Sequence, residues 1–128
     1  MDEPAGRHHR NLILWQKAMR LAVQVHHKTA AFPKCEYFGL TSQIRRAAVS
    51  IPSNVAEGSS RSTTREFIYF LHIARGSLAE LETQLLLARE FGYLQVSDYA
   101  NVAPLADEVG RLLTGFLQSL RRKNSASK

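Results

Sequence analysis

The chain has only one cysteine, Cys35, among its 128 residues, so no disulfide bond can form within it. No apolar run approaches the roughly 20 residues that a membrane-spanning helix needs. The first ten residues lack the apolar core of a secretory signal. These absences predict a cytoplasmic protein with no membrane association. The length and an apolar content of 45% are typical of a single globular domain.

Catalytic and metal-binding signatures are also absent. The sequence contains no phosphate-cradling loop, no dinucleotide-binding glycine motif and no H-E-x-x-H. Cys35 follows Lys34, but nothing supplies a general base, so an ordinary thiol is expected. His26 and His27 are adjacent and would point about 100° apart on a helix, which leaves only a site shared between subunits as a metal alternative. We therefore predict a non-enzymatic protein with no cofactor and no metal.

What the sequence does contain is helical periodicity. Apolar residues recur at three and four positions in four segments, and no segment alternates as a half-buried strand would. A capping box, Thr63-x-x-Glu66, opens the third segment, Gly92 ends it, and Ser97 is the expected cap of the fourth. Short connections favour an all-α, antiparallel up-and-down four-helix bundle. The expected helices cover residues 11–31, 38–58, 63–91 and 97–122, with a flexible N-terminus at 1–10 and a basic flexible tail at 123–128.

Three residues disturb this pattern. Pro52 and Pro104 fall inside the second and fourth helices, where each should kink the helix or split it. Gly76 lies in the middle of the third helix at a cost of about 1 kcal/mol relative to alanine. That cost suggests a close approach of a neighbouring helix at Gly76.

A polar row follows the second helix and faces a polar group on the third. The expected layer comprises Gln43, Arg46, Ser50, Asn54, Glu57, Ser77, Glu80 and Glu82. In an antiparallel pair, Arg45 or Arg46 would meet Glu80 or Glu82, and Ser50 or Asn54 would meet Ser77. Such a layer sets the register of two helices. The alternative is that Glu57, Glu80 and Glu82 include an acid–base pair.

Two helices carry more apolar surface than a bundle core needs. On the first helix, one apolar stripe comprises Leu12, Trp15, Met19 and Ala22, and an adjacent stripe comprises Leu14, Ala18, Leu21 and Val25. On the third, Ile68, Tyr69, Ile73, Leu86 and Leu87 lie away from the core stripe. Because large exposed apolar patches are rare on monomers, these faces predict a homo-oligomer.

The formal net charge of +6 favours an anionic partner such as RNA or DNA. A symmetric oligomer would repeat a modest basic patch several times and so bind phosphates without sequence preference. The alternative is a protein–protein scaffold whose charge serves solubility. The candidate phosphate contacts are Lys17, Arg20, Arg45, Arg61, Arg65, Arg121, Arg122 and Lys123.

Three segments resemble a known family. They are L-x-x-W-Q-K-A-M at 12–19, FGLTSQIRRAAVSIPSNVAEG at 38–58, and E-F-I-Y-F-L-x-I-A-x-G-S-L-A-E-L-E-T-Q-L at 66–85. Together they resemble the proteins encoded by intervening sequences in 23S ribosomal RNA genes. The resemblance covers roughly residues 10–122.

The resemblance implies an up-and-down four-helix bundle that assembles as a ring-shaped homopentamer without established enzymatic activity. The family is also similar in fold to accessory subunits of diversity-generating retroelements, which bind a reverse transcriptase and nucleic acid. It offers no catalytic residues to carry over. Its motif marks Gln43, Arg45, Arg46, Pro52, Asn54, Glu57, Gly58, Ser77, Glu80 and Glu82.

Overall fold

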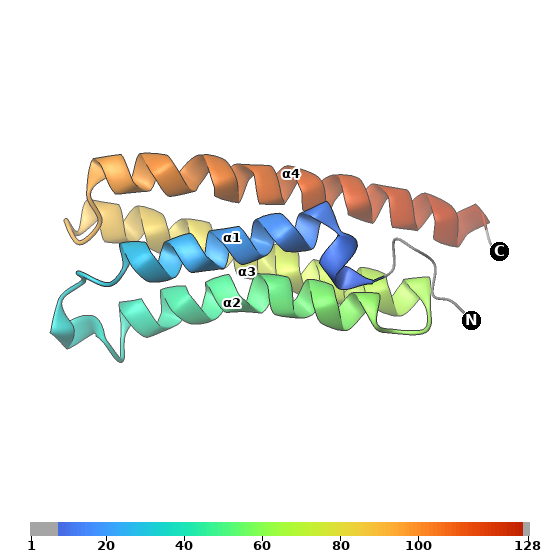
Figure 1. Cartoon of the computed structure of the whole chain (residues 1–128), viewed down its shortest axis with the longest axis horizontal. Coiled ribbons are helices and arrows are strands. Elements are labelled where there is room, and N and C mark those ends of the chain that lie inside the picture. The colour runs from blue at the N-terminus through green and yellow to red at the C-terminus, as the bar shows by residue number, and fades with distance from the viewer. Residues whose placement is uncertain (1–7, 127–128) are drawn as a thin grey trace.

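The computed structural model describes residues 8–126 and shows four long helices in this range, arranged side by side with neighbours antiparallel (Figure 1). The elements are η2 (His9–Asn11), α1 (Ile13–Lys28), η3 (Lys34–Glu36), α2 (Leu40–Ser59), α3 (Thr64–Glu90) and α4 (Val96–Ala126), where η denotes a short 3₁₀ turn. The predicted all-α class with four helices is confirmed, and no strand occurs within the described residues.

The two ends of the bundle differ in what they contain. At one end lie the start of α1, the turn between α2 and α3 and the last turns of α4 (Figure 1). We refer to it as the α2–α3 end. At the other lie η3 with the α1–α2 connection and the turn between α3 and α4. We refer to it as the α1–α2 end.

The core is built from one apolar stripe on each helix, at the helical spacing that the sequence shows. On α1 it comprises Leu14, Ala18, Leu21 and Val25, all of them buried. Corresponding stripes from α2, α3 and α4 complete one continuous cluster. Removal of this apolar surface from water, at about 25 cal/mol per Å², is the main force that holds the helices together. The α2–α3 pair forms the most extensive contact between any two helices.

The predicted limits of α3 follow from its caps. Thr63 Oγ1 accepts a hydrogen bond from the Glu66 amide at 3.1 Å, as the capping box predicts. Gly92 has a φ of +83°, the left-handed conformation that favours glycine after a helix. The sequence therefore placed both ends of this helix correctly to within two residues.

The ends of α1 and α2 differ from the prediction. α1 stops at Lys28 rather than Ala31. At its C-terminal end the Thr29 hydroxyl donates to the Val25 carbonyl at 2.9 Å. Gly58 does not end α2 but lies within it. A Cβ at this position would lie 2.8 Å from Phe67 Cδ1, so α2 and α3 approach each other closely at Gly58.

The proposed close approach at Gly76 is wrong. A Cβ at Gly76 would meet no atom of the described chain within 4 Å. The prolines do not split their helices, because α2 continues as one helix through Pro52 and α4 through Pro104. α4 starts at Val96, so Ser97 lies inside its first turn and the prediction that it caps this helix is wrong. The helix continues to Ala126, beyond the expected limit at residue 122. Residues 1–7 and 127–128 of the two expected flexible ends lie outside the described range.

Candidate functional site

The polar contact between α2 and α3 involves a small part of the predicted layer. The hydroxyls of Ser50 and Ser77 are 2.7 Å apart, and the Asn54 amide donates to the Ser50 carbonyl at 2.8 Å and to its hydroxyl at 3.0 Å. Ser77 is buried, and Ser50 and Asn54 are half-buried. A hydrogen bond in this position links the two helices at a defined axial register.

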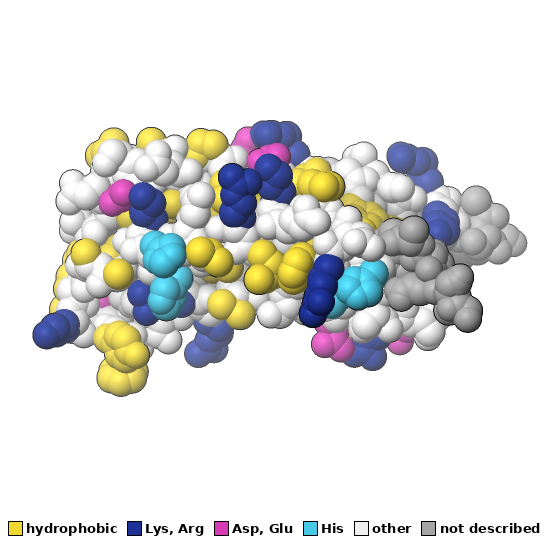
Figure 2. Space-filling view, viewed as in Figure 1, with side chains coloured by type: hydrophobic (Ala, Val, Ile, Leu, Met, Phe, Trp, Pro, Cys, Tyr) yellow, Lys and Arg dark blue, Asp and Glu magenta, His cyan; other side chains and the backbone are white. Residues whose placement is uncertain are grey.

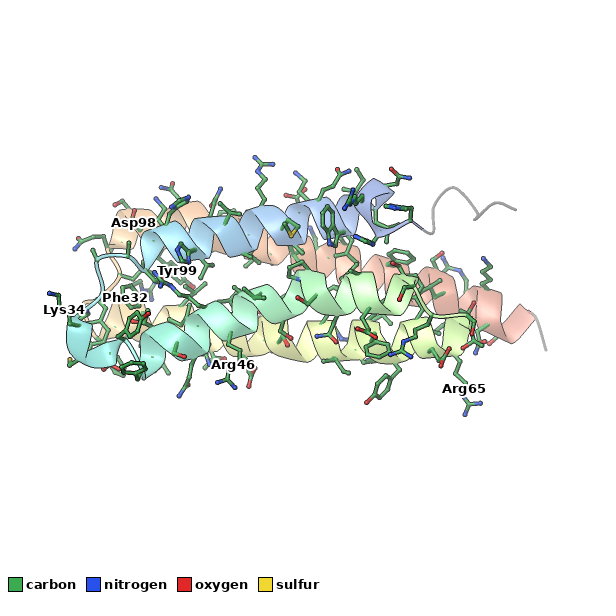
Figure 3. All side chains as sticks on the ribbon, turned by 60° about the horizontal axis from the view of Figure 1, so that its bottom comes forward. Phe32, Lys34, Arg46, Arg65, Asp98 and Tyr99 are labelled. Carbon is green, nitrogen blue, oxygen red and sulfur yellow. The ribbon has the colours of Figure 1, made fainter. Side chains whose placement is uncertain are left out.

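The charged part of the predicted layer is not assembled. Arg45 turns toward α1, where its Nε donates to Thr29 Oγ1 at 2.9 Å and one Nη donates to the His26 carbonyl at 3.2 Å. It therefore caps the C-terminal end of α1. Arg46 is exposed and projects away from the bundle (Figure 3), and no ion pair joins either arginine to Glu80 or Glu82 within residues 8–126.

Other members of that layer are dispersed on the surface. Gln43 and Glu80 are exposed, and Glu57 forms an ion pair with Arg61, one helical turn further on α2. The registers of α2 and α3 place Ser50 and Ser77 between the helices but leave the longer charged side chains on the outside. The predicted layer is thus mainly a solvated surface.

Glu82 lies close to a second carboxylate that the sequence did not indicate. It lines two neighbouring hollows between α3 and α4 together with Asp107 of α4. Burial raises the pKa of Glu82, and the negative charge of Asp107 raises it further. Asp107 also pairs with Arg111. The acid–base alternative paired Glu82 with Glu57 or Glu80, whereas the structure brings it close to a carboxylate on another helix.

Besides Arg45, which is bound to the end of α1, two further candidate phosphate contacts are engaged within the bundle. Lys17 on α1 forms an ion pair of 3.3 Å with Glu108 on α4. Arg61 pairs with Glu57, and its guanidinium lies over the Phe70 ring, 4.8 Å from the centroid. These contacts give both residues a structural role that the sequence did not predict.

The remaining candidates fall into two places. Arg20 is exposed on the middle of α1. Arg65, Arg121, Arg122 and Lys123 are exposed at the α2–α3 end, where Lys and Arg side chains stand along the last turns of α4 (Figure 2) and Arg65 points into solvent (Figure 3). The α2–α3 end therefore collects basic groups from two helices that are distant in sequence.

A second basic group at this end was not predicted from the sequence. One Nη of Arg121 lies 2.7 Å from Nε2 of His72, and one Nη of Arg75 lies 3.3 Å from Nδ1 of the same ring. Burial lowers the pKa of His72, and the positive charges of Arg75 and Arg121 lower it further. The spacing of His72 and Arg75 places them on one face of α3, but only the packing of α4 adds Arg121.

This group of three, the His72 cluster, has more hydrogen-bond donors than acceptors. A guanidinium only donates, and a neutral imidazole accepts through only one of its nitrogens. Both arginines nevertheless face the ring nitrogens. An oxyanion placed here would accept from both guanidinium groups and balance their charge.

Metal ligands do not converge in the described part of the chain. No group of three or more His, Cys, Asp or Glu side chains is placed to hold a metal ion in that range. His26 and His27, the adjacent histidines of α1, are both exposed. Cys35 is also exposed. Among the helices of the described residues, none combines the length and the apolar character that crossing a bilayer requires.

The second apolar faces are present on the surface. A groove of about 480 Å³ runs between α1 and α2, lined by Trp15, Met19, Val23, Val49 and Pro52, among others. Hydrophobic side chains gather along the seam of these two helices (Figure 2). On α3, more than a third of the surface of each of Tyr69, Ile73, Leu86 and Leu87 is exposed. Ile68 is partly buried against the core.

Comparison with known proteins identifies relatives of this fold. The sequence model described as "23S rRNA-intervening sequence protein" matches residues 10–115. A crystal structure of a protein of unknown function from the S23 ribosomal protein family of Bacteroides thetaiotaomicron superposes with a TM-score of 0.77 at 23% identity. The superposition covers 83% of this chain and 96% of that one. The search of curated proteins found no match.

Proposed function

The chain belongs to the family of 23S rRNA-intervening sequence proteins, and on this basis we propose that it binds RNA or DNA with little sequence preference. The observation that carries the proposal is the collection of exposed basic groups at the α2–α3 end. Arg65 from the start of α3 and Arg122 from the end of α4 are exposed there, together with Arg121 of the His72 cluster.

The composition of this surface suits a phosphate backbone. Arginine side chains bind phosphate oxygens through paired N–H groups, and such contacts carry affinity without reading the base sequence. The His72 cluster adds donors for which the chain provides too few acceptors. A phosphodiester oxygen close to this cluster would raise the pKa of His72, because a negative charge stabilises the protonated imidazole.

Assembly would multiply this surface. We propose that the chain forms a homo-oligomer, a pentameric ring as the family resemblance implies, through the apolar groove between α1 and α2 and the apolar face of α3. Each copy would then contribute one basic end to a common face of the ring. Several weak phosphate contacts acting together give an affinity that one copy lacks. A cytoplasmic location is consistent with such a ligand.

The test is fluorescence anisotropy of a labelled structured RNA and a labelled duplex DNA, measured over a series of salt concentrations with protein stripped of nucleic acid. The variant Arg65→Glu/Arg122→Glu should bind at least about tenfold more weakly. The slope of log K against the logarithm of the salt concentration should become shallower by about 1 for each lost phosphate contact. In the unmodified protein, the pKa of His72, followed by NMR, should rise when the oligonucleotide is bound.

Arg20→Glu is the matched control, because Arg20 is equally exposed but lies on the middle of α1. Arg61 is unsuitable for reversal, because it packs on Phe70 and pairs with Glu57. Unchanged binding by the double variant, or an equal loss in Arg20→Glu, would count against the α2–α3 end as the binding surface.

A second candidate function is a protein–protein scaffold that docks a partner such as a reverse transcriptase. The observation that favours it is the apolar face of α3, which includes Tyr69 and Leu87 and is free for a partner if the copies associate through the groove between α1 and α2 alone. Absence of nucleic-acid binding even at low salt, with the oligomer intact, would favour this candidate over the first.

A further inference from the structure

A pocket of about 440 Å³ lies at the α1–α2 end, on the opposite side of the molecule from the basic α2–α3 end. The residues that define its chemistry are Phe32, Lys34, Tyr37, Phe38, Thr41 and Arg45. Figure 3 shows Phe32 and Lys34 at this end, far from Arg65. The pocket thus combines aromatic rings, two cations and the hydroxyls of Thr29, Tyr37 and Thr41. It shares no residue with the nucleic-acid surface proposed above.

The aromatic side chains of the pocket are not all buried as they would be in a closed core. Phe32 is buried against the Tyr93 ring, with the centroids 5.8 Å apart. Tyr37 and Phe38 meet edge to face at 4.9 Å, yet Phe38 is 91% exposed. A phenylalanine that is held against a neighbour but left in solvent offers an open ring face for stacking.

A buried hydroxyl in the pocket wall has no partner. Thr41 is 4% exposed, and its Oγ1 forms no hydrogen bond within the described residues. Buried polar atoms are nearly always satisfied, so the Thr41 hydroxyl has hydrogen-bonding capacity for a group that enters the pocket. Arg45 follows one turn later on the same face of α2 and uses only part of its donors on Thr29 and His26.

The charge of the pocket is positive. Lys34 stands at its rim, and Arg45 lines it. The nearby carboxylate of Glu36 is already engaged, because one oxygen accepts from the Leu40 amide at 3.1 Å and the other from the Tyr93 hydroxyl at 3.0 Å. These two bonds cap α2 and anchor the chain on which Tyr37 and Phe38 lie.

We propose that this pocket binds a small molecule in which an aromatic ring carries a carboxylate or phosphate group. The ring stacks on Phe38 and Tyr37, and the anionic group lies toward Arg45 with the Thr41 hydroxyl in reach after a small side-chain adjustment. The volume suits a molecule between an aromatic carboxylic acid and a mononucleotide in size. The site is separate from the α2–α3 end, so either proposal can fail without the other.

Calorimetric titration and chemical-shift perturbation test the chemistry with two probes, phenylacetate and 5′-AMP. Acetate supplies the anion without the ring, and benzyl alcohol supplies the ring without the anion. The proposal expects saturable binding of at least one probe and no saturable binding of either fragment. Binding of 5′-AMP alone would identify a nucleotide site, and binding of phenylacetate alone an aromatic acid site.

Substitutions locate the binding. Phe38→Ala should lower the affinity for the probe by up to about tenfold through loss of one stacking contact. Thr41→Val should also lower this affinity and leave the fold intact. Tyr69→Ala, an exposed aromatic residue on α3, is the matched control and should bind normally. Absence of binding of both probes at millimolar concentration, or equal binding by Phe38→Ala and the unmodified chain, would overturn the proposal. Oligonucleotide binding should not change in Phe38→Ala.

Discussion

At the scale of single residues, Gly58 and Gly76 show that the same residue type has opposite surroundings on two helices. Gly58 is buried, and a Cβ there would lie 2.8 Å from Phe67 Cδ1 and 2.9 Å from Phe70 Cβ. At Gly76 the corresponding space is empty. Only Gly58 therefore has a packing reason within the chain for lacking a side chain.

This difference predicts opposite effects of alanine. Gly58→Ala should destabilise the fold by about 1–3 kcal/mol, because Phe67 or Phe70 must move. Gly76→Ala should stabilise it by up to about 1 kcal/mol, because alanine restricts the unfolded chain and favours helix. Denaturant unfolding followed by circular dichroism measures both, and a destabilised Gly76→Ala would instead indicate that another copy packs there.

At the scale of elements, the α2–α3 pair depends on a hydrogen bond as well as on apolar packing. Ser50 and Ser77 face each other at 2.7 Å inside the most extensive helix contact. Asn54 donates to Ser50 from one turn further along α2, so three polar groups satisfy one another in a partly buried position. Such a group penalises a shift of one helix along the other, since a shift would leave the hydroxyls without partners.

A double-mutant cycle tests this coupling. Ser50→Ala and Ser77→Ala should each cost about 1–2 kcal/mol in the free energy of unfolding, because each leaves the other hydroxyl unsatisfied. The double variant should cost less than the sum of the two. Thr83→Ala is the control, because its hydroxyl only donates to the Ala79 carbonyl on the surface of α3, and it should change stability by less than about 0.5 kcal/mol. Strict additivity would show that the serines do not interact.

At the scale of the whole molecule, the surface divides into apolar sides and a basic end. The groove between α1 and α2 and the outer face of α3 lie along the bundle, whereas Arg65, Arg121 and Arg122 lie at its α2–α3 end. This separation permits neighbouring copies to associate through their sides while their basic ends remain accessible. Oligomerisation and nucleic-acid binding are therefore proposed to use different surfaces.

The groove offers a direct test of assembly. Val23→Glu/Val49→Glu should weaken self-association at least about tenfold, because association would bury two unpaired carboxylates. The mass in solution, measured by light scattering over a range of concentrations, reports the outcome. Val96→Glu is the control, because Val96 is exposed at the start of α4 and outside the groove. An unmodified chain with the mass of a single copy would disprove the oligomer itself.

Sequence patterns alone determined the helices and much of the core, because these depend on interactions within a few residues. The capping box at Thr63, the glycine at position 92 and the apolar stripe on α1 were all readable without a structure. Each is a short-range feature governed by helical geometry.

The tertiary structure alone decided which side chains meet across helices. It turned Arg45 toward the end of α1, brought Arg121 to His72 and Asp107 close to Glu82, and made Gly58 rather than Gly76 the close contact. These pairings depend on how each helix is rotated and shifted against its neighbours. Helical periodicity does not determine this rotation and shift. They are determined only when all four apolar stripes are buried together.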